Sequence, residues 1–325
     1  MLRIGIPSAM FYYIYYPMWK TFFEELGVQV VTSGKTTRQL LDNGVREALA
    51  DACVPVKVYF GHAMALANRV DYLFIPRIVC LNKKTVYCPK FLGLPDMIRY
   101  GIANMPPIID VRIDARDRKD SILSAYYKVG KMLGKTPMHI TKALLKARMV
   151  QFKFDGLLHR GLQPLEAMDT IFNGKKGYTP GNKKQLKFAV VGYPYIIHDQ
   201  YISIGIANKL QKMGIDVVTS DNLSPLTLRL QRHEPAKQLF WTFSERTLRA
   251  TRYYARQKDI DGIIHLTAFG CGPDSIVDRF IQLDNYSSSI PFMSLTIDEH
   301  SGEAGVNTRL EAFVDMVRRK KGAYS

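Results

Sequence analysis

Short apolar runs alternate with segments of helical spacing along this 325-residue chain. Runs with the composition of buried strands cover 2–6, 28–32, 72–75 and 108–113, and then 188–192, 216–219, 262–267 and 292–297. Strands that alternate with helices form parallel sheets, because each helix carries the chain back to the start of the next strand. The sequence therefore predicts an α/β fold with parallel sheets.

The second set of strands repeats the first. Residues 26–33 read LGVQVVTS and residues 213–220 read MGIDVVTS, so in both places a helix ends at glycine and leads into a β-branched strand. DYLFIPRIVC (71–80) and DGIIHLTAFGC (261–271) also match, and each ends in a cysteine. Chance is the alternative explanation, since βαβ units resemble one another. We predict two similar Rossmann-like domains.

The two sets of strands are separated by a helical region. Helical spacing continues for about fifty residues after Asp117, and the stretch 174–184, rich in Lys, Gly, Pro and Asn, is typical of a linker. A chain of this length can bury two cores. The predicted organisation is an N-terminal Rossmann-like domain (1–115), a helical connection with a basic linker (116–184) and a C-terminal Rossmann-like domain (185–325).

Composition limits location and partners. No stretch of about 20 apolar residues predicts a membrane span, and the start of the chain lacks the features of a signal peptide. We therefore expect a cytoplasmic protein with reduced thiols. A net charge of +16 has two explanations: attraction to an acidic molecule, or charged side chains that only face solvent. No nucleic-acid-binding motif accompanies the charge, which disfavours nucleic acid as a partner.

Four cysteines are the main candidates for chemistry: Cys53, Cys80, Cys88 and Cys271. Proline follows Cys53, Cys88 and Cys271 within two residues. Because proline is favoured in the first turn of a helix, these three thiols are expected at helix N-termini, where backbone N–H groups and the helix dipole favour a thiolate.

The cysteine spacing does not match common metal motifs. The chain has no C-x-x-C pair of the zinc-ribbon kind and none of the tight cysteine runs of ferredoxins. A cluster assembled from distant loops is compatible with the spacing, and so are four unrelated buried thiols, because cysteine is often buried.

Other polar residues follow the predicted strands, where ligands bind in open α/β sheets. Those expected to line a cleft are Ser8, Tyr12 to Tyr16, Tyr193, Tyr195 and His198. In the TIDEHSGE segment, Asp298 precedes three candidate catalytic residues, Glu299, His300 and Glu303, which offer proton transfer or metal ligation; a helix N-cap cluster is the structural alternative. The cations near Cys80 and Cys88 either tune a cluster, bind phosphate or face solvent: Arg77, Lys83, Lys84 and Lys90.

Five segments carry a family resemblance: GIPSAMFYYIYYPMWKTFFEELGVQVV, DACVPVKVYFGHA, IPRIVCLNKKTVYCPKFLGLPDMIR, LTAFGCGPDSIVDR and SLTIDEHSGEAGVNTRLEAF. Together they span nearly the whole chain, which resembles the activase-associated protein family related to 2-hydroxyacyl-CoA dehydratases and benzoyl-CoA reductases. The resemblance implies paired Rossmann-like domains and cysteine ligation of a [4Fe–4S] cluster or a larger double-cubane cluster. It assigns the ligand role to all four cysteines, whereas dehydratase subunits of this group typically use three.

The same resemblance implies partners. An ATP-hydrolysing activase would donate low-potential electrons, and ATP chemistry would belong to that partner because this chain has no phosphate-loop sequence of its own. A homologous cluster-bearing subunit is a further expected partner, and a homodimer is the default for this architecture. The expected function is electron transfer or reduction within an acyl-CoA dehydratase or reductase system. The alternatives are a non-redox binding module for a phosphorylated ligand, such as CoA or a nucleotide, and a basic nucleic-acid binder.

Overall fold

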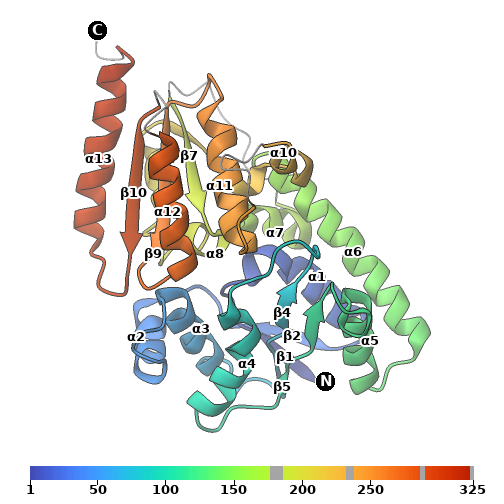
Figure 1. The fold of residues 1–325 in the computed structure, drawn as a ribbon. Coiled ribbons are helices and arrows are strands. Elements are labelled where there is room, and N and C mark those ends of the chain that lie inside the picture. The colour runs from blue at the N-terminus through green and yellow to red at the C-terminus, as the bar shows by residue number, and fades with distance from the viewer. Residues whose placement is uncertain (176–185, 232–237, 286–289, 323–325) are drawn as a thin grey trace.

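The computed structural model describes residues 1–175, 186–231, 238–285 and 290–322. Figure 1 shows two lobes, each built around a sheet, with the long helix α6 (Pro137–His159) running along the side of both. Nearly all of the linker predicted over 174–184 lies outside the described residues. The predicted domain boundaries themselves stay predictions.

The first lobe contains a four-stranded parallel sheet. Its order is β2-β1-β3-β5, formed by β2 (Gln29–Thr32), β1 (Arg3–Ile6), β3 (Tyr72–Phe74) and β5 (Ile108–Ile109). A parallel pair, β4 (Arg77–Cys80) and β6 (Arg112–Asp114), continues β3 and β5. The Arg77 N–H donates to the Val111 carbonyl at 3.0 Å, so the ladder runs on past the break.

The second lobe repeats this topology. Its parallel sheet has the order β8-β7-β9-β10, formed by β8 (Ile215–Thr219), β7 (Leu186–Gly192), β9 (Gly262–Ala268) and β10 (Phe292–Ile297). In chain order, both sheets place the second strand beside the first and the third on the other side. The predicted fold class, with two similar halves and parallel sheets, is confirmed.

Helices fill the gaps between strands. In the first lobe they are α1 (Tyr12–Glu25), α2 (Arg38–Glu47), α3 (Val54–Met64) and α4 (Pro89–Gly101). In the second they are α8 (Pro194–Ile197), α9 (Ile206–Lys212), α10 (Pro225–Arg229), α11 (Thr242–Ala255), α12 (Gly272–Asn285) and α13 (Glu303–Lys320). Between the lobes, the predicted helical connection contains the 3₁₀ turn Arg118–Asp120, then α5 (Ile122–Met132), α6 and α7 (Pro164–Asn173).

Close backbone packing fixes α3 against α2. A Cβ atom added to Gly44 would lie 1.9 Å from the Lys57 carbonyl oxygen, and one added to Gly61 would lie 1.9 Å from the Leu40 carbonyl oxygen. Any side chain at either glycine would therefore separate the helices. This contact positions the N-terminus of α3, where Cys53 lies.

Aromatic side chains join the two lobes. Phe91 of the first lobe packs against Phe11 at 4.4 Å and against Tyr195 of the second lobe at 5.9 Å between ring centroids. Tyr87 packs edge-on against Phe243 at 5.0 Å. Aromatic pairs of this kind contribute about 0.5–1.5 kcal/mol each beyond their buried area.

None of the helices described is long and apolar enough to cross a membrane.

Candidate functional site

Three cysteines lie at helix N-termini, as the proline spacing predicts. Cys53 caps α3 and Cys88 caps α4, and Cys271 directly precedes α12. The first two belong to the first lobe and Cys271 to the second. In each case the proline takes a first-turn position where no N–H is needed, so the remaining N–H groups are free to face the thiol.

The same three cysteines lie in one region, where the lobes touch. A Cβ atom added to Gly270 would lie 3.7 Å from the Cα of Cys53, so the loop that carries Cys271 packs on the start of α3. The Cys271 thiol has both Cys53 and Cys88 as electrostatic neighbours. We call Cys53, Cys88 and Cys271 the cysteine centre.

Burial controls the protonation of this centre. It raises the pKa of Cys53 and of Cys88, although the Lys90 ammonium opposes the shift at both. It also raises the pKa of Cys271, where the Asp274 carboxylate adds to the effect. The backbone N–H groups at the helix starts lower the pKa of Cys53 and Cys88, as expected, but loss of water around each sulfur is the larger effect and raises the pKa overall.

Tyr195 covers the centre. Its side chain is buried, and the electrostatic neighbours of its hydroxyl include all three cysteines of the centre. Tyr193 lies beside it, with ring centroids 5.8 Å apart, and shares a 2.7 Å hydrogen bond with Ser244. His198 instead bonds Asp221 at 2.7 Å, so of the three residues predicted to follow β7 into the cleft, the two tyrosines face the thiols.

Cys80 has different surroundings. It is fully buried in β4, in register with Asp114 of β6, and its carbonyl accepts a 2.8 Å hydrogen bond from the Ala115 N–H. Tyr87 and Arg116 are neighbours of its thiol. The prediction that Cys80 is a fourth ligand stays a prediction.

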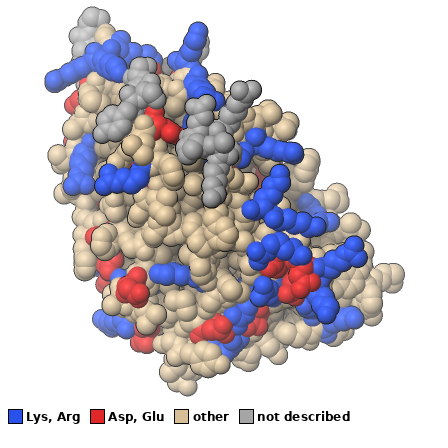
Figure 2. All heavy atoms as spheres, in the orientation of Figure 1, with Lys and Arg blue, Asp and Glu red and all other residues tan. Residues whose placement is uncertain are grey.

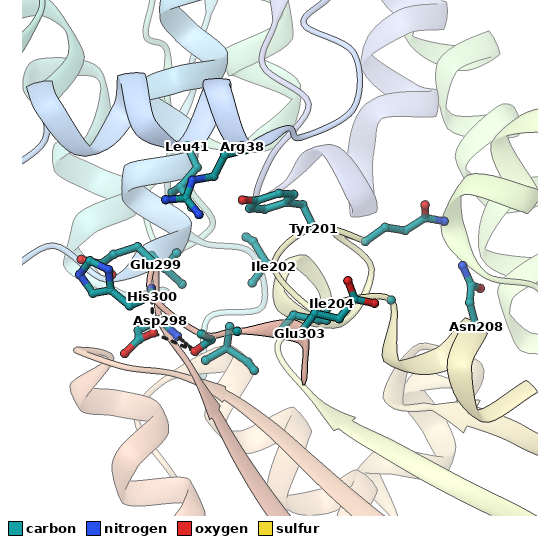
Figure 3. Close-up of a pocket in the computed structure, with 16 residues that line it drawn as sticks. Arg38, Leu41, Tyr201, Ile202, Ile204, Asn208, Asp298, Glu299, His300 and Glu303 are labelled. Carbon is teal, nitrogen blue, oxygen red and sulfur yellow. Dashed lines mark hydrogen bonds between the residues drawn. The ribbon is translucent and has the colours of Figure 1, made fainter. Parts of the chain in front are cut away.

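The candidate acid–base residues line one pocket of about 480 Å³ between the lobes. Figure 3 shows Glu299, His300 and Glu303 around it, with Arg38 of α2 on the opposite side from Asp298. Val54, the residue after Cys53, also lines this pocket, but no cysteine of the centre does.

Two of these candidates are held in ion pairs. Glu299 bonds the buried ammonium of Lys57, and Glu303 bonds Lys209 at 2.6 Å. These cations keep the pKa of both carboxyl groups below the usual range. At neutral pH both are therefore bases or cation-binding groups rather than acids. Asp298 serves the loop, accepting a 2.9 Å hydrogen bond from the His300 N–H.

The remaining predicted cleft residues are divided among other sites. Ser8, Tyr12, Tyr13 and Tyr16 line a pocket of about 540 Å³ with Asp199 of the second lobe. Tyr15 and Lys84 line a third pocket.

Arg77 is held by Asp96 and Asp110, so it is a structural cation. Lys83 adopts a positive φ of 62° in the loop after β4.

Two buried histidines form hydrogen-bond networks that the sequence did not reveal. In the first lobe, His62 shares hydrogen bonds with Ser33 at 2.7 Å and Thr36 at 2.9 Å, and Thr36 donates to Asp199 at 2.5 Å. In the second lobe, His265 pairs with Asp274 and Asp278. A histidine in an apolar segment gives no sign of which distant residues it will contact. The only sequence signal was the spacing of Asp274 and Asp278, which lie one helical turn apart and therefore on the same face of a helix.

Comparison with known proteins identifies the family. The family model described as the CoA enzyme activase uncharacterised domain matches residues 3–223. This chain belongs to that family. The matched region of the activase-family chain includes Cys53, Cys80, Cys88 and Tyr195, whereas Cys271 lies beyond it.

Other comparisons add little to the family assignment. No curated protein matches the activase-family chain. Among solved structures, it is similar to a periplasmic sugar-binding protein from Pseudomonas fluorescens, with 11% sequence identity, a TM-score of 0.23 and coverage of 96% of this chain and 90% of the other. A TM-score of this size is too low to compare the two molecules in detail.

The described residues contain no group of three or more His, Cys, Asp or Glu side chains arranged around a single metal ion. A zinc site of the usual compact kind is therefore not supported in this part of the chain. The three thiols of the centre are soft ligands of the kind that iron–sulfur clusters use.

Proposed function

We propose that this activase-family chain holds an iron–sulfur cluster on Cys53, Cys88 and Cys271 and takes part in low-potential electron transfer. One observation carries the proposal: three cysteines from both lobes lie at three helix N-termini and are electrostatic neighbours of one another and of Tyr195. A [4Fe–4S] cluster on three thiolates retains one iron for another ligand, and Cys80 or a second chain would be needed for a closed or larger double-cubane site. When bound, the cluster supplies one-electron chemistry.

The chain's own residues support an anionic group at this position. The N-terminal N–H groups of α3, α4 and α12 and the nearby Lys90 ammonium favour negative charge. Cys271 is buried and Cys53 and Cys88 are partly buried, which limits the access of water, and the buried Tyr195 hydroxyl is a hydrogen-bond donor in the neighbourhood of these thiols. Because burial raises the pKa of all three thiols, binding of a cluster to their thiolates would release protons.

The family description and the absence of a phosphate-loop sequence support an ATP-hydrolysing activase as the electron donor. The reaction served would be that of an acyl-CoA dehydratase or reductase. The pocket lined by Glu299, His300 and Glu303 also contains Val54, the residue after Cys53, and it is the proposed site for the molecule that is reduced or dehydrated.

The direct test is iron and acid-labile sulfide per chain after anaerobic reconstitution. We expect about four irons per chain, a sharp loss in Cys271→Ala, and nearly full retention in Cys80→Ala, which is the matched control. Absence of iron from the wild-type protein would reject the redox function. Equal losses in both variants would show that all four cysteines are ligands.

A second candidate function is binding of a phosphorylated ligand. A pocket of about 550 Å³ between the lobes is lined by Lys84, Arg229 and Arg246, and Figure 2 shows further Lys and Arg side chains on this face near α10 and α6. The buried Nε of Arg246 has no hydrogen-bond partner among the described residues. A phosphate oxygen is a natural acceptor for it.

Calorimetric titration with coenzyme A and with pantetheine, which lacks phosphate, tests this second function. We expect binding of coenzyme A alone, weakened at least tenfold in Arg246→Gln and unchanged in Arg3→Gln, which lies outside the pocket. Equal binding of both compounds, or of neither, would reject a phosphate site here.

A further inference from the structure

The long helix α6 carries large apolar side chains on two opposite faces. In Figure 1 the helix forms one edge of the molecule and runs along both lobes. Its inner face packs on the rest of the chain through buried residues: Ile140, Ala143, Leu144, Ala147, Phe154 and Leu158. A surface helix normally turns polar side chains to the outside. The apolar side chains on the outer face therefore need a separate explanation.

Four of these side chains form a row on the outer face. They are between 59% and 82% exposed: Met138, Leu145, Met149 and Phe152. Because each residue turns the helix by about 100°, their spacing places them within about 60° of its circumference, on the side away from the buried residues. Single exposed apolar residues are common, but a row on one face is typical of a surface that another molecule covers. We call these four residues the α6 stripe.

Positive charge borders the α6 stripe on both sides. Lys142 and Lys153 lie along one edge of the row and Arg148 lies along the other. All three side chains are exposed, and none forms an ion pair within the described ranges. Asp155 is the only carboxylate among residues 137–159, and it lines a pocket between the lobes instead. The outer face of α6 is therefore apolar along its middle and cationic at its edges.

The shape of the stripe favours a helical partner. Leu145, Met149 and Phe152 follow one another at steps of four and three residues, which is the spacing of a coiled-coil seam. From Met138 to Phe152 the row spans about 21 Å, or about four helical turns. A helix that lies on a membrane buries a broad apolar face, whereas this row is narrow. A second helix packed along α6 would cover it.

The charges restrict the partner further. In paired helices, the side chains that flank the seam decide which partner is accepted, and like charges repel. A second copy of this chain would place the cations of one α6 against those of the other, which disfavours self-association through this helix. Glu or Asp side chains beside the seam of a partner would instead pair with Lys142, Arg148 and Lys153.

We infer that the α6 stripe is a docking surface for an amphipathic helix of another protein, whose apolar seam is bordered by acidic residues. This role requires neither the cysteine centre nor the ligand pockets between the lobes. The row is short, so the complex is expected to be weak and reversible.

The test uses the full-length protein and three fluorescent synthetic peptides of about 21 residues, which is three heptads. The first peptide has leucine at the seam positions and glutamate at the flanking positions. The second has the same composition in scrambled order, and the third has lysine in place of each glutamate. Fluorescence anisotropy at low salt measures the affinity of each peptide.

We expect the first peptide to bind about tenfold more tightly, or better, than either of the others. The double variant Met149→Gln with Phe152→Gln should bind it about tenfold more weakly, because the seam is interrupted while the charge is unchanged. Leu283→Gln is the matched control, since it makes a similar change at an exposed leucine of α12, and it should bind as wild type does.

A second double variant, Lys142→Gln with Lys153→Gln, tests the charges without changing the seam. It should bind the first peptide about threefold more weakly and should reduce the effect of added salt on binding. Lys146 is kept, because it already pairs with Glu25. The replaced side chains are exposed, so thermal unfolding of each variant should match that of the wild type.

Equal binding of the first peptide and its scrambled form would show that charge alone attracts them and would overturn the inference. Equal binding of the lysine peptide would overturn the acidic character of the partner. Two other occupants are tested with the Met149→Gln, Phe152→Gln variant. If it loses binding to phosphatidylserine vesicles but keeps peptide binding, the stripe is a membrane surface. If light scattering shows a wild-type dimer that this variant disrupts, the stripe binds a second copy, and either result would overturn the inference.

Discussion

The two lobes share one strand order but bury their histidines in opposite electrostatic states. His62 in the first lobe contacts two hydroxyl groups, and burial lowers its pKa to about 4. His265 in the second lobe lies between two carboxylates, which raise its pKa to about 9 despite full burial. Repetition of a fold therefore does not repeat its chemistry, because side chains outside the strand pattern decide the charge.

The largest expected difference is in stability when each histidine is replaced by glutamine. His265→Gln leaves the buried Asp274 carboxylate and the partly buried Asp278 carboxylate without their cation and should lower the free energy of unfolding by about 3–5 kcal/mol. His62→Gln keeps hydrogen-bonding capacity beside Ser33 and Thr36, so a loss of about 1–2 kcal/mol is expected. Urea unfolding of both variants measures the difference, and equal losses would erase the comparison.

The next effect is an opposite dependence of stability on pH. The folded-state pKa of His62 is below the usual 6.5, so its contribution is complete above pH 6.5 and is lost as pH falls toward 4. The folded-state pKa of His265 is above 6.5, so its contribution is complete below pH 6.5 and is lost as pH rises through 9. Each pKa shift corresponds to a change of about 3 kcal/mol in the free energy of unfolding across its pH range.

Unfolding free energies measured from pH 4 to pH 10 test this second prediction. His62→Gln should flatten the acid side of the profile, and His265→Gln should flatten the alkaline side. A profile in which both variants flatten the same side would contradict the assigned charge states.

The smallest expected losses of stability come from replacing the carboxylates Glu299 and Glu303. Glu299→Gln leaves the buried Lys57 ammonium without its partner across the lobe interface and should cost about 1–2 kcal/mol. Glu303→Gln breaks a solvent-exposed pair with Lys209 and should leave thermal unfolding unchanged. Thermal unfolding of the two variants distinguishes them, and a larger loss in Glu303→Gln would contradict the buried character of the Lys57 pair.

The sequence predicted the parts of the molecule that depend on local pattern. Alternating apolar runs identified every strand of both four-stranded sheets, and the prolines after Cys53, Cys88 and Cys271 placed these cysteines at helix N-termini. The predicted equivalence of LGVQVVTS and MGIDVVTS is also confirmed. The two strings contain β2 and β8, and each of these strands pairs with the first strand of its own sheet.

Properties that depend on distant contacts were not predictable from the sequence. The state of the thiols depends on how deeply they are buried, and the sequence shows helix starts but not burial. The His62 network needs Thr36 and Asp199, which are separated by 163 positions. Glu299 and Glu303 look like free acids in the sequence, but Lys57 and Lys209 reach them only in the folded chain.

The central claim is that cysteines from both lobes share one cluster. The most direct measurement is the low-temperature EPR spectrum of the anaerobically reconstituted protein after reduction with dithionite, recorded for wild type, Cys271→Ala and Cys80→Ala. We predict a cluster signal in wild type that persists in Cys80→Ala and is lost or altered in Cys271→Ala. An identical signal in wild type and Cys271→Ala, or no signal in any sample, would contradict a cluster shared between the lobes.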